Sequence, residues 1–258
     1  MSKKIKLLQI LFFTLFAIPS HSKAIFTPEM REELCARKRQ HISAPPITLL
    51  PEGSVDWFHD IGDFASRGRF AFNNAPELLG SIACLVRNHH IDMIIETGTF
   101  KGHTTLGLAL LAPTHTIDIN QSYYRKSAAL LEGKPNITRH IGHSATVLAS
   151  ILPDLIDKRI LFYLDAHWLS DWPLLAEIEA VATTHKDRCV LVIDDAQVPH
   201  YHSIPFDSYD GKNLSYDYVK PVLGQAFSQH KVSYLIPKKP QSRAKMVIEP
   251  VSTNTPST

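Results

Sequence analysis

Five short runs that are predicted as strands alternate with helical stretches in the middle of the chain, and this alternation restricts the fold more than any other feature. The runs cover residues 93–95, 115–119, 137–141, 159–164 and 189–193. Apolar residues at helical spacing follow them at 104–111, 122–131, 145–152 and 174–181. Strands that alternate with helices form a mostly parallel sheet covered by helices on both faces. We therefore predict an α/β, doubly wound, Rossmann-like domain.

The residues on either side of this alternating region set the domain boundaries. A helix over 76–87 begins at Pro76, and proline favours the first helical position. After the last run come a long polar and aromatic loop (198–218), a helix (219–229) and a hairpin formed by 232–236 and 245–248. A loop of that length is typical of a lid or a substrate-binding loop. We predict one domain over 76–251, a helical N-terminal extension over 25–75 and a disordered tail over 252–258.

Residues 1–24 have the pattern of a secretory signal peptide. Three lysines within the first six residues precede an apolar run over 7–18, and Ser22-Lys23-Ala24 supplies small residues for cleavage. We expect export to the periplasm or the outside of the cell, with an uncleaved membrane anchor or a buried N-terminal helix as alternatives. The apolar run is short for a bilayer, so no stable membrane span is expected after cleavage.

Removal of the leader changes the charge balance. The full chain has 27 basic and 25 acidic residues and a formal charge of +2, and the leader holds four lysines and no acid. The remaining part has 23 basic and 25 acidic residues, which gives a formal charge of −2. Nucleic-acid-binding domains carry a basic surplus, so we expect no nucleic-acid partner.

Acidic residues stand at the ends of four of the five predicted strands. Glu96 follows the first run, Asp118 lies at the end of the second, Asp165 follows the fourth, and Asp194-Asp195 follows the fifth. Ligands of open α/β sheets bind outside the carboxyl ends of the strands. We predict that these acids converge on one rim of the sheet and form the functional site.

A turn with two glycines links the first run to its helix. Its sequence is Glu96-Thr97-Gly98-Thr99-Phe100-Lys101-Gly102, in which Gly98 allows a tight turn and Gly102 opens the helix. The turn departs from the dinucleotide motif at Phe100, and it lacks the lysine that follows the last glycine of a P-loop. A ligand with a ribose and no phosphate fits better. Asp118 is placed to bind the hydroxyls of that ribose.

From about residue 76 to residue 251 the chain resembles the class I S-adenosylmethionine-dependent methyltransferases. The resemblance rests on residues 95–105, 116–119, 162–168 and 192–195 and on the terminal hairpin. It implies a seven-stranded sheet with the cofactor over its first two strands, Gly98 against the methionine part, Asp118 at the ribose and residues 142–144 near the adenine. His143 replaces the acidic residue often found there. The cofactor-binding residues that the resemblance implies are Glu96, Gly98, Thr99, Gly102, Thr104, Asp118, His143, Ser144 and Asp165.

A narrower resemblance is to the catechol O-methyltransferase-like branch, which holds a divalent metal at the ends of the fourth and fifth strands. Asp165, Asp194 and Asp195 stand at those positions, with Asp195 in place of an asparagine. Three carboxylates suit Mg²⁺, Mn²⁺ or Ca²⁺, which would bind substrate oxygens and lower the pKa of a hydroxyl. Alternatively, these acids cap helices or orient backbone amides.

Histidines near these strand ends are further candidates. Asp165 and His167 are the candidate catalytic residues, with His167 as general base on a hydroxyl or, alternatively, as a hydrogen-bonding loop residue. His200 and His202 are either zinc ligands or solvent-facing loop residues. Five aromatic residues either wall a substrate pocket or pack over the edge of the core: Trp168, Trp172, Tyr201, Phe206 and Tyr209.

Three functional hypotheses follow from the sequence. The first is methyl transfer from S-adenosylmethionine to a hydroxyl of a small molecule or glycan, by in-line displacement at the sulfonium. The second is an exported, non-catalytic binding domain that keeps the fold, because the cofactor is made in the cytosol. The third is delivery into another cell or compartment that contains the cofactor. The oligomeric state is left open by the sequence.

Overall fold

The computed structural model describes residues 64, 67–167, 170–239 and 241–251. The predicted leader, most of the predicted N-terminal extension, Trp168 and the predicted tail lie outside the described residues. Among the described residues, no helix is long and apolar enough to cross a membrane.

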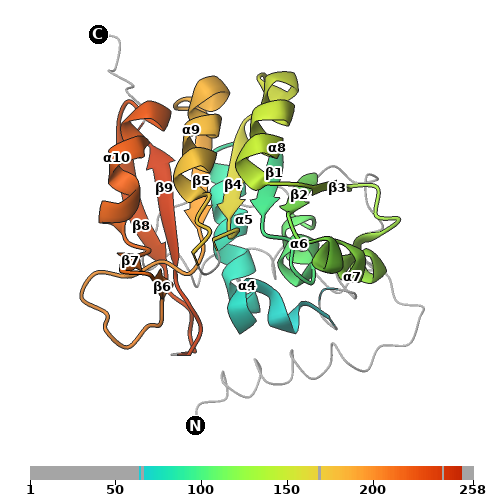
Figure 1. Ribbon diagram of the computed structural model, residues 1–258, viewed down its shortest axis with the longest axis horizontal. Coiled ribbons are helices and arrows are strands. Elements are labelled where there is room, and N and C mark those ends of the chain that lie inside the picture. The colour runs from blue at the N-terminus through green and yellow to red at the C-terminus, as the bar shows by residue number, and fades with distance from the viewer. Residues whose placement is uncertain (1–63, 65–66, 168–169, 240, 252–258) are drawn as a thin grey trace, which may run out of the picture. The chain divides into compact units, whose positions relative to one another are not determined.

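One mixed sheet of seven strands forms the centre of the fold (Figure 1). Its strands are β1 (Met93–Thr97), β2 (Thr114–Asp118), β3 (Ile137–Ile141), β4 (Ile160–Leu164), β5 (Cys189–Ile193), β8 (His230–Leu235) and β9 (Lys245–Pro250). They are arranged in the order β3-β2-β1-β4-β5-β9-β8. The first five strands are parallel, whereas β9 runs antiparallel to both β5 and β8. The predicted fold class, a Rossmann-like sheet with a C-terminal antiparallel hairpin, is confirmed.

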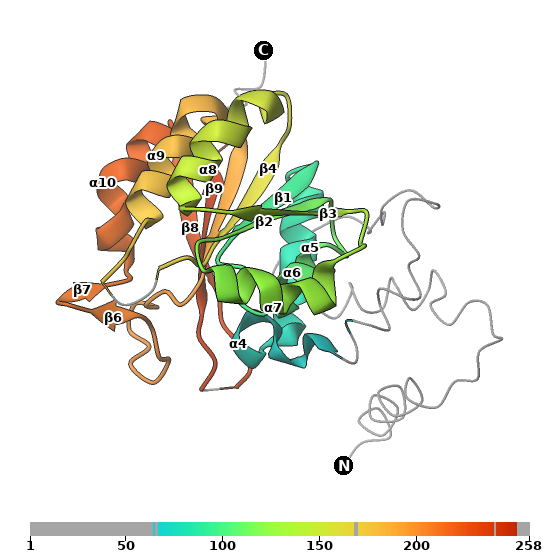
Figure 2. The ribbon, with the colours of Figure 1, turned by 45° about the vertical axis from the view of Figure 1, so that its right-hand side comes forward.

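Helices cover both faces of the sheet (Figures 1 and 2). Their bounds are α4 (Ala71–Asn74), α5 (Leu79–Asn88), α6 (His103–Leu108), α7 (Gln121–Leu131), α8 (Ser144–Ile151), α9 (Leu174–His185) and α10 (Tyr216–Ala226). Short 3₁₀ turns add η1 (Gly68–Phe70), η2 (Pro76–Leu78) and η3 (Leu152–Leu155). Helices α8, α9 and α10 pack on one face, and α4 and α5 pack on the other.

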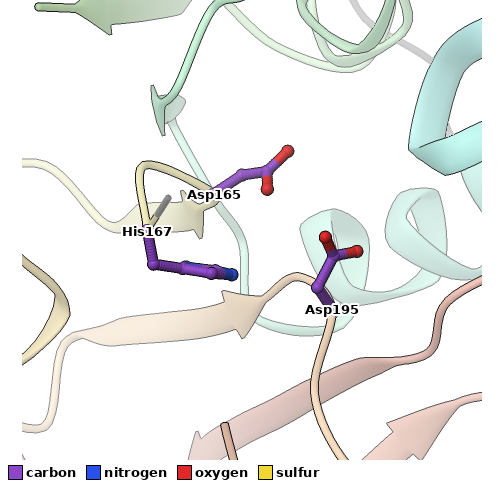
Figure 3. A group of neighbouring side chains, drawn as sticks. All are labelled: Asp165, His167 and Asp195. Carbon is purple, nitrogen blue, oxygen red and sulfur yellow. The ribbon is translucent and has the colours of Figure 1, made fainter. Parts of the chain in front are cut away.

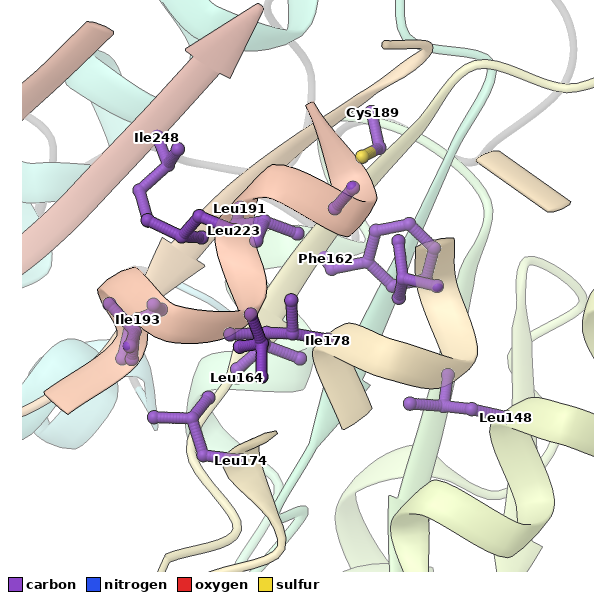
Figure 4. Packing of buried hydrophobic residues seen from close by; sticks show 14 of the residues in the cluster. Leu148, Phe162, Leu164, Leu174, Ile178, Cys189, Leu191, Ile193, Leu223 and Ile248 are labelled. Carbon is purple, nitrogen blue, oxygen red and sulfur yellow. The ribbon is translucent and has the colours of Figure 1, made fainter. Parts of the chain in front are cut away.

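Alternating strand residues point to the two faces, so each strand contributes to two cores. Phe162, Leu164 and Leu191 pack beneath α8, α9 and α10 (Figure 4). Their neighbours Leu161 and Val190 face α4 and α5 instead. Strands that are buried on both faces form continuous apolar runs, which explains why β4 and β5 are uniformly apolar in sequence.

The structure differs from the predicted elements in two places. Glycines and asparagines around 67–74 predict a loop, but residues 68–74 form η1 and α4, and Phe72 is completely buried. The long loop expected over 198–218 contains a small hairpin, β6 (Ser208–Tyr209) and β7 (Lys212–Asn213), and α10 begins at Tyr216 rather than at 219. Tyr209 lies in this hairpin, and Tyr216 and Tyr218 lie in the first turn of α10, whereas Tyr201 and Phe206 remain in the loop. Asp217 in that first turn favours a helix start because it complements the helix dipole.

The two cysteines in the described part of the chain, Cys84 on α5 and Cys189 on β5, are free thiols. Cys189 is buried, and burial raises the pKa of its thiol well above the usual value. Such a thiol is a packing group of low reactivity.

Candidate functional site

The strand ends with acidic residues lie side by side at one edge of the sheet. In the register, Thr97 of β1 pairs with Ile117 of β2 and with Leu164 of β4, and Leu164 pairs with Ile193 of β5. The residues that follow these positions are therefore neighbours in space. The predicted convergence of strand-end acids is present in the structure.

The turn between β1 and α6 depends on two glycines. Gly98 has a φ of +86° and Gly102 a φ of +83°, values that side chains disfavour. A Cβ atom on Gly98 would also overlap the backbone carbonyl of Asp165. Gly98 donates its N–H to the Ile117 carbonyl at 2.9 Å. The turn is thus held between β2 and the segment after β4, and only glycine fits there.

Asp118 at the end of β2 presents a fixed carboxylate next to this turn. Its Oδ2 accepts from the Phe100 N–H at 2.8 Å, and its Oδ1 accepts from the Asn120 N–H at 2.7 Å. Burial raises the pKa of Asp118, and these two amides oppose that rise. Each carboxylate oxygen has a further lone pair, so Asp118 can accept hydrogen bonds from the two hydroxyls of a ribose.

Apolar side chains surround Asp118 and are exposed. Ile119 is 61% exposed, Phe100 49% and Ile141 44%. Asp118 and Ile141 are partners in the β2–β3 register, and the Phe100 ring lies 4.6 Å from that of Tyr123. Exposed apolar surface beside a polar anchor is typical of a site for a flat, partly apolar ligand. Ile119, Phe100 and Ile141 were not among the predicted binding residues, although Ile119 and Ile141 stand at the ends of strands and Phe100 lies in the glycine turn.

Glu96 and Thr99 point into the protein rather than toward the surface. Glu96 is 1% exposed, and its Oε2 accepts from the hydroxyls of Thr105 at 2.5 Å and Thr116 at 2.6 Å. The hydroxyls of Thr99 and Thr116 lie 2.6 Å apart. Burial raises the pKa of Glu96 to about 8, so this carboxyl is mainly protonated at neutral pH. These side chains tie the glycine turn to β1, β2 and α6.

The other predicted cofactor residues occupy different surroundings. The Thr104 hydroxyl accepts from the Phe72 N–H at 3.0 Å, which joins α6 to α4. His143 is exposed and precedes α8. Ser144 is buried, and its hydroxyl has no hydrogen-bond partner among the described residues. Ser144 and His143 lie at the end of β3, whereas Thr104 takes part in helix packing.

Asp194 after β5 is paired with a buried lysine. The ammonium of Lys245 contacts Asp194 Oδ1, and the two side chains are 0% and 1% exposed. The Asp195 N–H donates to the same oxygen at 2.6 Å, and the Tyr163 hydroxyl donates to Oδ2 at 2.5 Å. Burial raises the pKa of Asp194, but Lys245 and these hydrogen bonds outweigh it, so the net shift is downward. Both oxygens of Asp194 are therefore engaged within the protein.

Asp195 is held by two other parts of the chain. Its carboxylate accepts from Arg243 Nη1 at 2.6 Å and from the Asn73 side-chain amide. Arg243 also contacts Asp207, which is 2% exposed and lies in the loop before β6. Asp195 has a positive φ of 56°, a strained conformation of the kind that gathers at functional sites. Asp195 is thus the point where β5, α4 and the loop meet.

Asp165, His167 and Asp195 form a compact group (Figure 3). One candidate ligand atom of each lies within 4.8 Å of those of the other two. His167 is 3% exposed, and neither ring nitrogen has a hydrogen-bond partner among the described residues. Its Nε2 lies 3.7 Å from Asp207 Oδ2.

Burial lowers the pKa of His167, so the imidazole is neutral. Burial, Asp194 and Asp195 raise the pKa of Asp165 well above its usual range. Burial and Asp194 do the same for Asp195. A bound cation would favour the charged forms of these two carboxyls, because an opposite charge nearby lowers their pKa values.

Of the expected metal ligands Asp165, Asp194 and Asp195, the structure brings the first and third together with His167 and directs Asp194 to Lys245. His200 and His202 are exposed, and neither belongs to this group. The sequence analysis missed Asn73, Asp207, Arg243 and Lys245. The only available signal was the basic residues immediately before and at the start of the last strand.

The predicted aromatic residues divide into two sets. Trp172 is buried, lies 6.0 Å from the His167 ring, and packs edge-on against Tyr209 at 6.4 Å. Tyr201, by contrast, is 53% exposed. Trp172 and Tyr209 thus pack together beside His167.

Comparison with known proteins identifies the fold. No protein-family model matches the chain, and no curated protein matches it. Among solved structures, a protein from Klebsiella pneumoniae assigned as an O-methyltransferase matches with a TM-score of 0.51 and 15% identity, over 85% of this chain and 98% of that one. The O-methyltransferase of Bacillus cereus, solved with S-adenosylhomocysteine, matches with a TM-score of 0.50 and 13% identity, over 86% and 98%. The chain therefore has the fold of the class I S-adenosylmethionine-dependent methyltransferases.

The residues present fit both groups that this fold implies. For the cofactor, the glycine turn, the fixed Asp118 carboxylate and the exposed apolar residues beside it match the chemistry of an adenosyl group. For a divalent cation, two carboxylates and a buried imidazole without a hydrogen-bond partner provide a donor set.

Proposed function

We propose that this protein transfers a methyl group from S-adenosylmethionine to a hydroxyl of a small molecule or glycan. The observation that carries the proposal is the Asp118 carboxylate, fixed by two backbone amides beside the Gly98 turn and flanked by exposed Ile119 and Ile141. A related fold in Bacillus cereus binds S-adenosylhomocysteine, the product of such a transfer. The nucleoside would lie over β1 and β2.

The methyl group would be transferred beside the end of β4. Gly98 lies against the Asp165 backbone, so a methionine part bound over the turn would bring its sulfonium toward Asp165 and His167. In-line displacement needs positioning of the nucleophile and removal of its proton. Asp165 is only partly buried and adjoins the turn, so we assign it as the proton acceptor, with His167 beside it in the neutral state. A divalent cation, when bound at these strand ends, would lower the pKa of the substrate hydroxyl.

The charge of the site favours neutral or cationic acceptors over nucleic acid. Asp165, Asp194, Asp195 and Asp207 all lie at this rim, against the cations of Lys245 and Arg243. A phosphodiester chain would be repelled by the excess of carboxylates. A hydroxylated small molecule or glycan meets no such barrier.

The second candidate is an exported domain that binds a ligand without catalysis. It is favoured by the pattern of residues 1–24 and by His143, which stands where related proteins often have an acid near the adenine. Export itself is part of the proposal, and cell fractionation of a C-terminally tagged full chain would test it. Recovery of the tagged protein in the cytosol at full length would contradict export.

The test of the first proposal is calorimetric titration of the full chain with S-adenosylmethionine and S-adenosylhomocysteine. We expect micromolar binding, weakened at least about tenfold by Asp118→Ala, because hydrogen bonds to a charged acceptor contribute about 1.5–3 kcal/mol each. Asp157→Ala is the matched control, since Asp157 is exposed and pairs with the exposed Lys158. Binding followed by transfer of a labelled methyl group to a hydroxylated acceptor supports the enzyme. Binding without transfer to any acceptor favours the binding domain, and no binding by the folded chain rules out the first proposal.

A further inference from the structure

We propose that Asp165, His167 and Asp195 bind one divalent cation of the transition series, with His167 as a ligand in the place that the sequence had suggested for Asp194. The three side chains come from the ends of β4 and β5, and their ligand atoms lie within 4.8 Å of one another (Figure 3). This inference does not rest on methyl transfer, because it concerns only ion binding by these three residues.

Asp194 is not available as a ligand. Its Oδ1 is engaged by the Lys245 ammonium and the Asp195 N–H, and its Oδ2 by the Tyr163 hydroxyl. Lys245 already supplies the positive charge that this carboxylate requires. Withdrawing Asp194 to bind a metal would leave a buried ammonium without its counter-charge, which is strongly unfavourable.

The imidazole of His167 is buried and unsatisfied. The ring is 3% exposed, and both nitrogens lack a hydrogen-bond partner among the described residues. Figure 3 shows a ring nitrogen directed toward the carboxylate of Asp195. Buried polar groups are almost always satisfied, so a buried ring of this kind indicates a missing partner. A metal ion between His167, Asp165 and Asp195 would be that partner.

The charges around the three residues also favour a divalent cation. The carboxylates of Asp165, Asp194, Asp195 and Asp207 lie near the cations of Lys245 and Arg243. When the four carboxylates are ionised, two negative charges remain uncompensated, which is the charge of one divalent cation. Arg243 and Asn73 orient Asp195 from outside the group, as partners of metal ligands commonly do.

The ligand types predict which ion binds. Mg²⁺ and Ca²⁺ prefer oxygen ligands alone, whereas an imidazole with carboxylates suits Mn²⁺, Fe²⁺, Co²⁺ or Zn²⁺. The sequence had suggested a hard cation on three carboxylates. Because His167 rather than Asp194 is the third ligand, we expect the site to prefer ions of the transition series.

The test uses the full chain, freed of metal by chelation and titrated with Co²⁺, whose visible absorption reports nitrogen ligands. We expect one Co²⁺ per chain, no displacement by a hundredfold excess of Mg²⁺, and a loss of affinity of about 100-fold or more in His167→Gln. The exposed His200→Gln is the matched control and should bind as the wild type does. Asp165→Asn should also weaken binding but keep the absorption bands of a nitrogen ligand.

Three results would overturn the proposal: no Co²⁺ binding by the folded wild type, equal binding by His167→Gln, or displacement of Co²⁺ by equimolar Mg²⁺. If His167→Gln does not fold, ¹⁵N-histidine spectra of the wild type replace it. Stoichiometric Zn²⁺ should then shift the ring-nitrogen signals of one histidine that is not exposed to solvent. A shift confined to the exposed histidines would refute the site. Binding of S-adenosylmethionine is measured in a separate titration. Failure of the methyltransferase proposal can therefore be distinguished from failure of the metal site.

Discussion

The ammonium of Lys245 pairs with the carboxylate of Asp194, and both side chains are buried beneath the functional edge of the sheet. The pair exists because β9 runs antiparallel beside β5. Met246 pairs with Ile193 in the register, so Lys245 is brought to the residue that follows Ile193. An internal cation is thus built into the acidic edge by the reversed strand.

Replacement of Lys245 by methionine should lower the free energy of unfolding by about 3–5 kcal/mol, because it leaves the Asp194 carboxylate buried without its counter-charge. Urea denaturation followed by circular dichroism measures the change. Lys231→Met is the matched control, since the Lys231 side chain is 60% exposed and its pair with Glu249 contributes about 1 kcal/mol or less. Adding Asp194→Asn to Lys245→Met should recover part of the loss. Equal effects of the two lysine variants would contradict a stabilising role for the buried pair.

Glu96 should make stability depend on pH. Burial raises the pKa of its carboxyl from 4.5 to about 8, so between these values the native state holds one proton more than the unfolded state. The free energy of unfolding should therefore decrease as pH rises through this window, by at most about 1.4 kcal/mol per pH unit from this group. The contribution is fully favourable below pH 4.5 and lost by about pH 8.

The measurement compares urea denaturation of the wild type and Glu96→Gln at several pH values between 5 and 8. The wild-type stability, relative to the variant, should fall across this range, because glutamine does not titrate. Glu132→Gln, at an exposed position, serves as the matched control for the substitution itself. A flat difference for Glu96→Gln would show that Glu96 is ionised throughout.

Comparison with Gly133 separates two properties of Gly98, its positive φ and its close approach to the Asp165 backbone. Both have a positive φ, +86° and +77°, but a Cβ on Gly98 overlaps the Asp165 carbonyl, whereas a Cβ on Gly133 meets nothing within 4 Å. Gly133→Ala should therefore cost about 1–2 kcal/mol from backbone strain alone. Gly98→Ala should cost clearly more and should also abolish binding of S-adenosylhomocysteine. Thermal denaturation and calorimetry measure the two effects, and similar losses for both variants would show that the overlap relaxes.

The sequence was sufficient to predict the sheet and the acidic strand ends. Apolar runs such as 160–164 identify a strand buried on both faces, and the parallel arrangement then places Asp118, Asp165 and Asp194 at one edge. These inferences depend only on local patterns and on the direction of neighbouring strands. They therefore required no knowledge of side-chain contacts.

The partners of those acids could not be predicted in the same way. Lys245 reaches Asp194 only because β9 lies between β5 and β8, and that strand order has no local sequence signal. Asn73 reaches Asp195 from α4, where Phe72, Asn73 and Asn74 all have positive φ values. The spacing correctly predicted that the three carboxylates lie near one another. Side-chain partners that are distant in the sequence determine which of the three can bind a ligand.

Arg243 should control the mobility of the loop before β6. Its guanidinium joins Asp195 after β5 to Asp207, so it fastens that loop to the edge of the sheet. Charge-assisted hydrogen bonds contribute about 1.5–3 kcal/mol, and their loss in Arg243→Gln should increase local opening of residues 198–215 about tenfold or more. Hydrogen exchange of this segment, detected by mass spectrometry, measures the opening. The exposed Arg188→Gln, before the opposite end of β5, should leave exchange unchanged. Faster exchange across the whole sheet, rather than in the loop alone, would mean that Arg243 stabilises the fold globally and does not act as a specific tether.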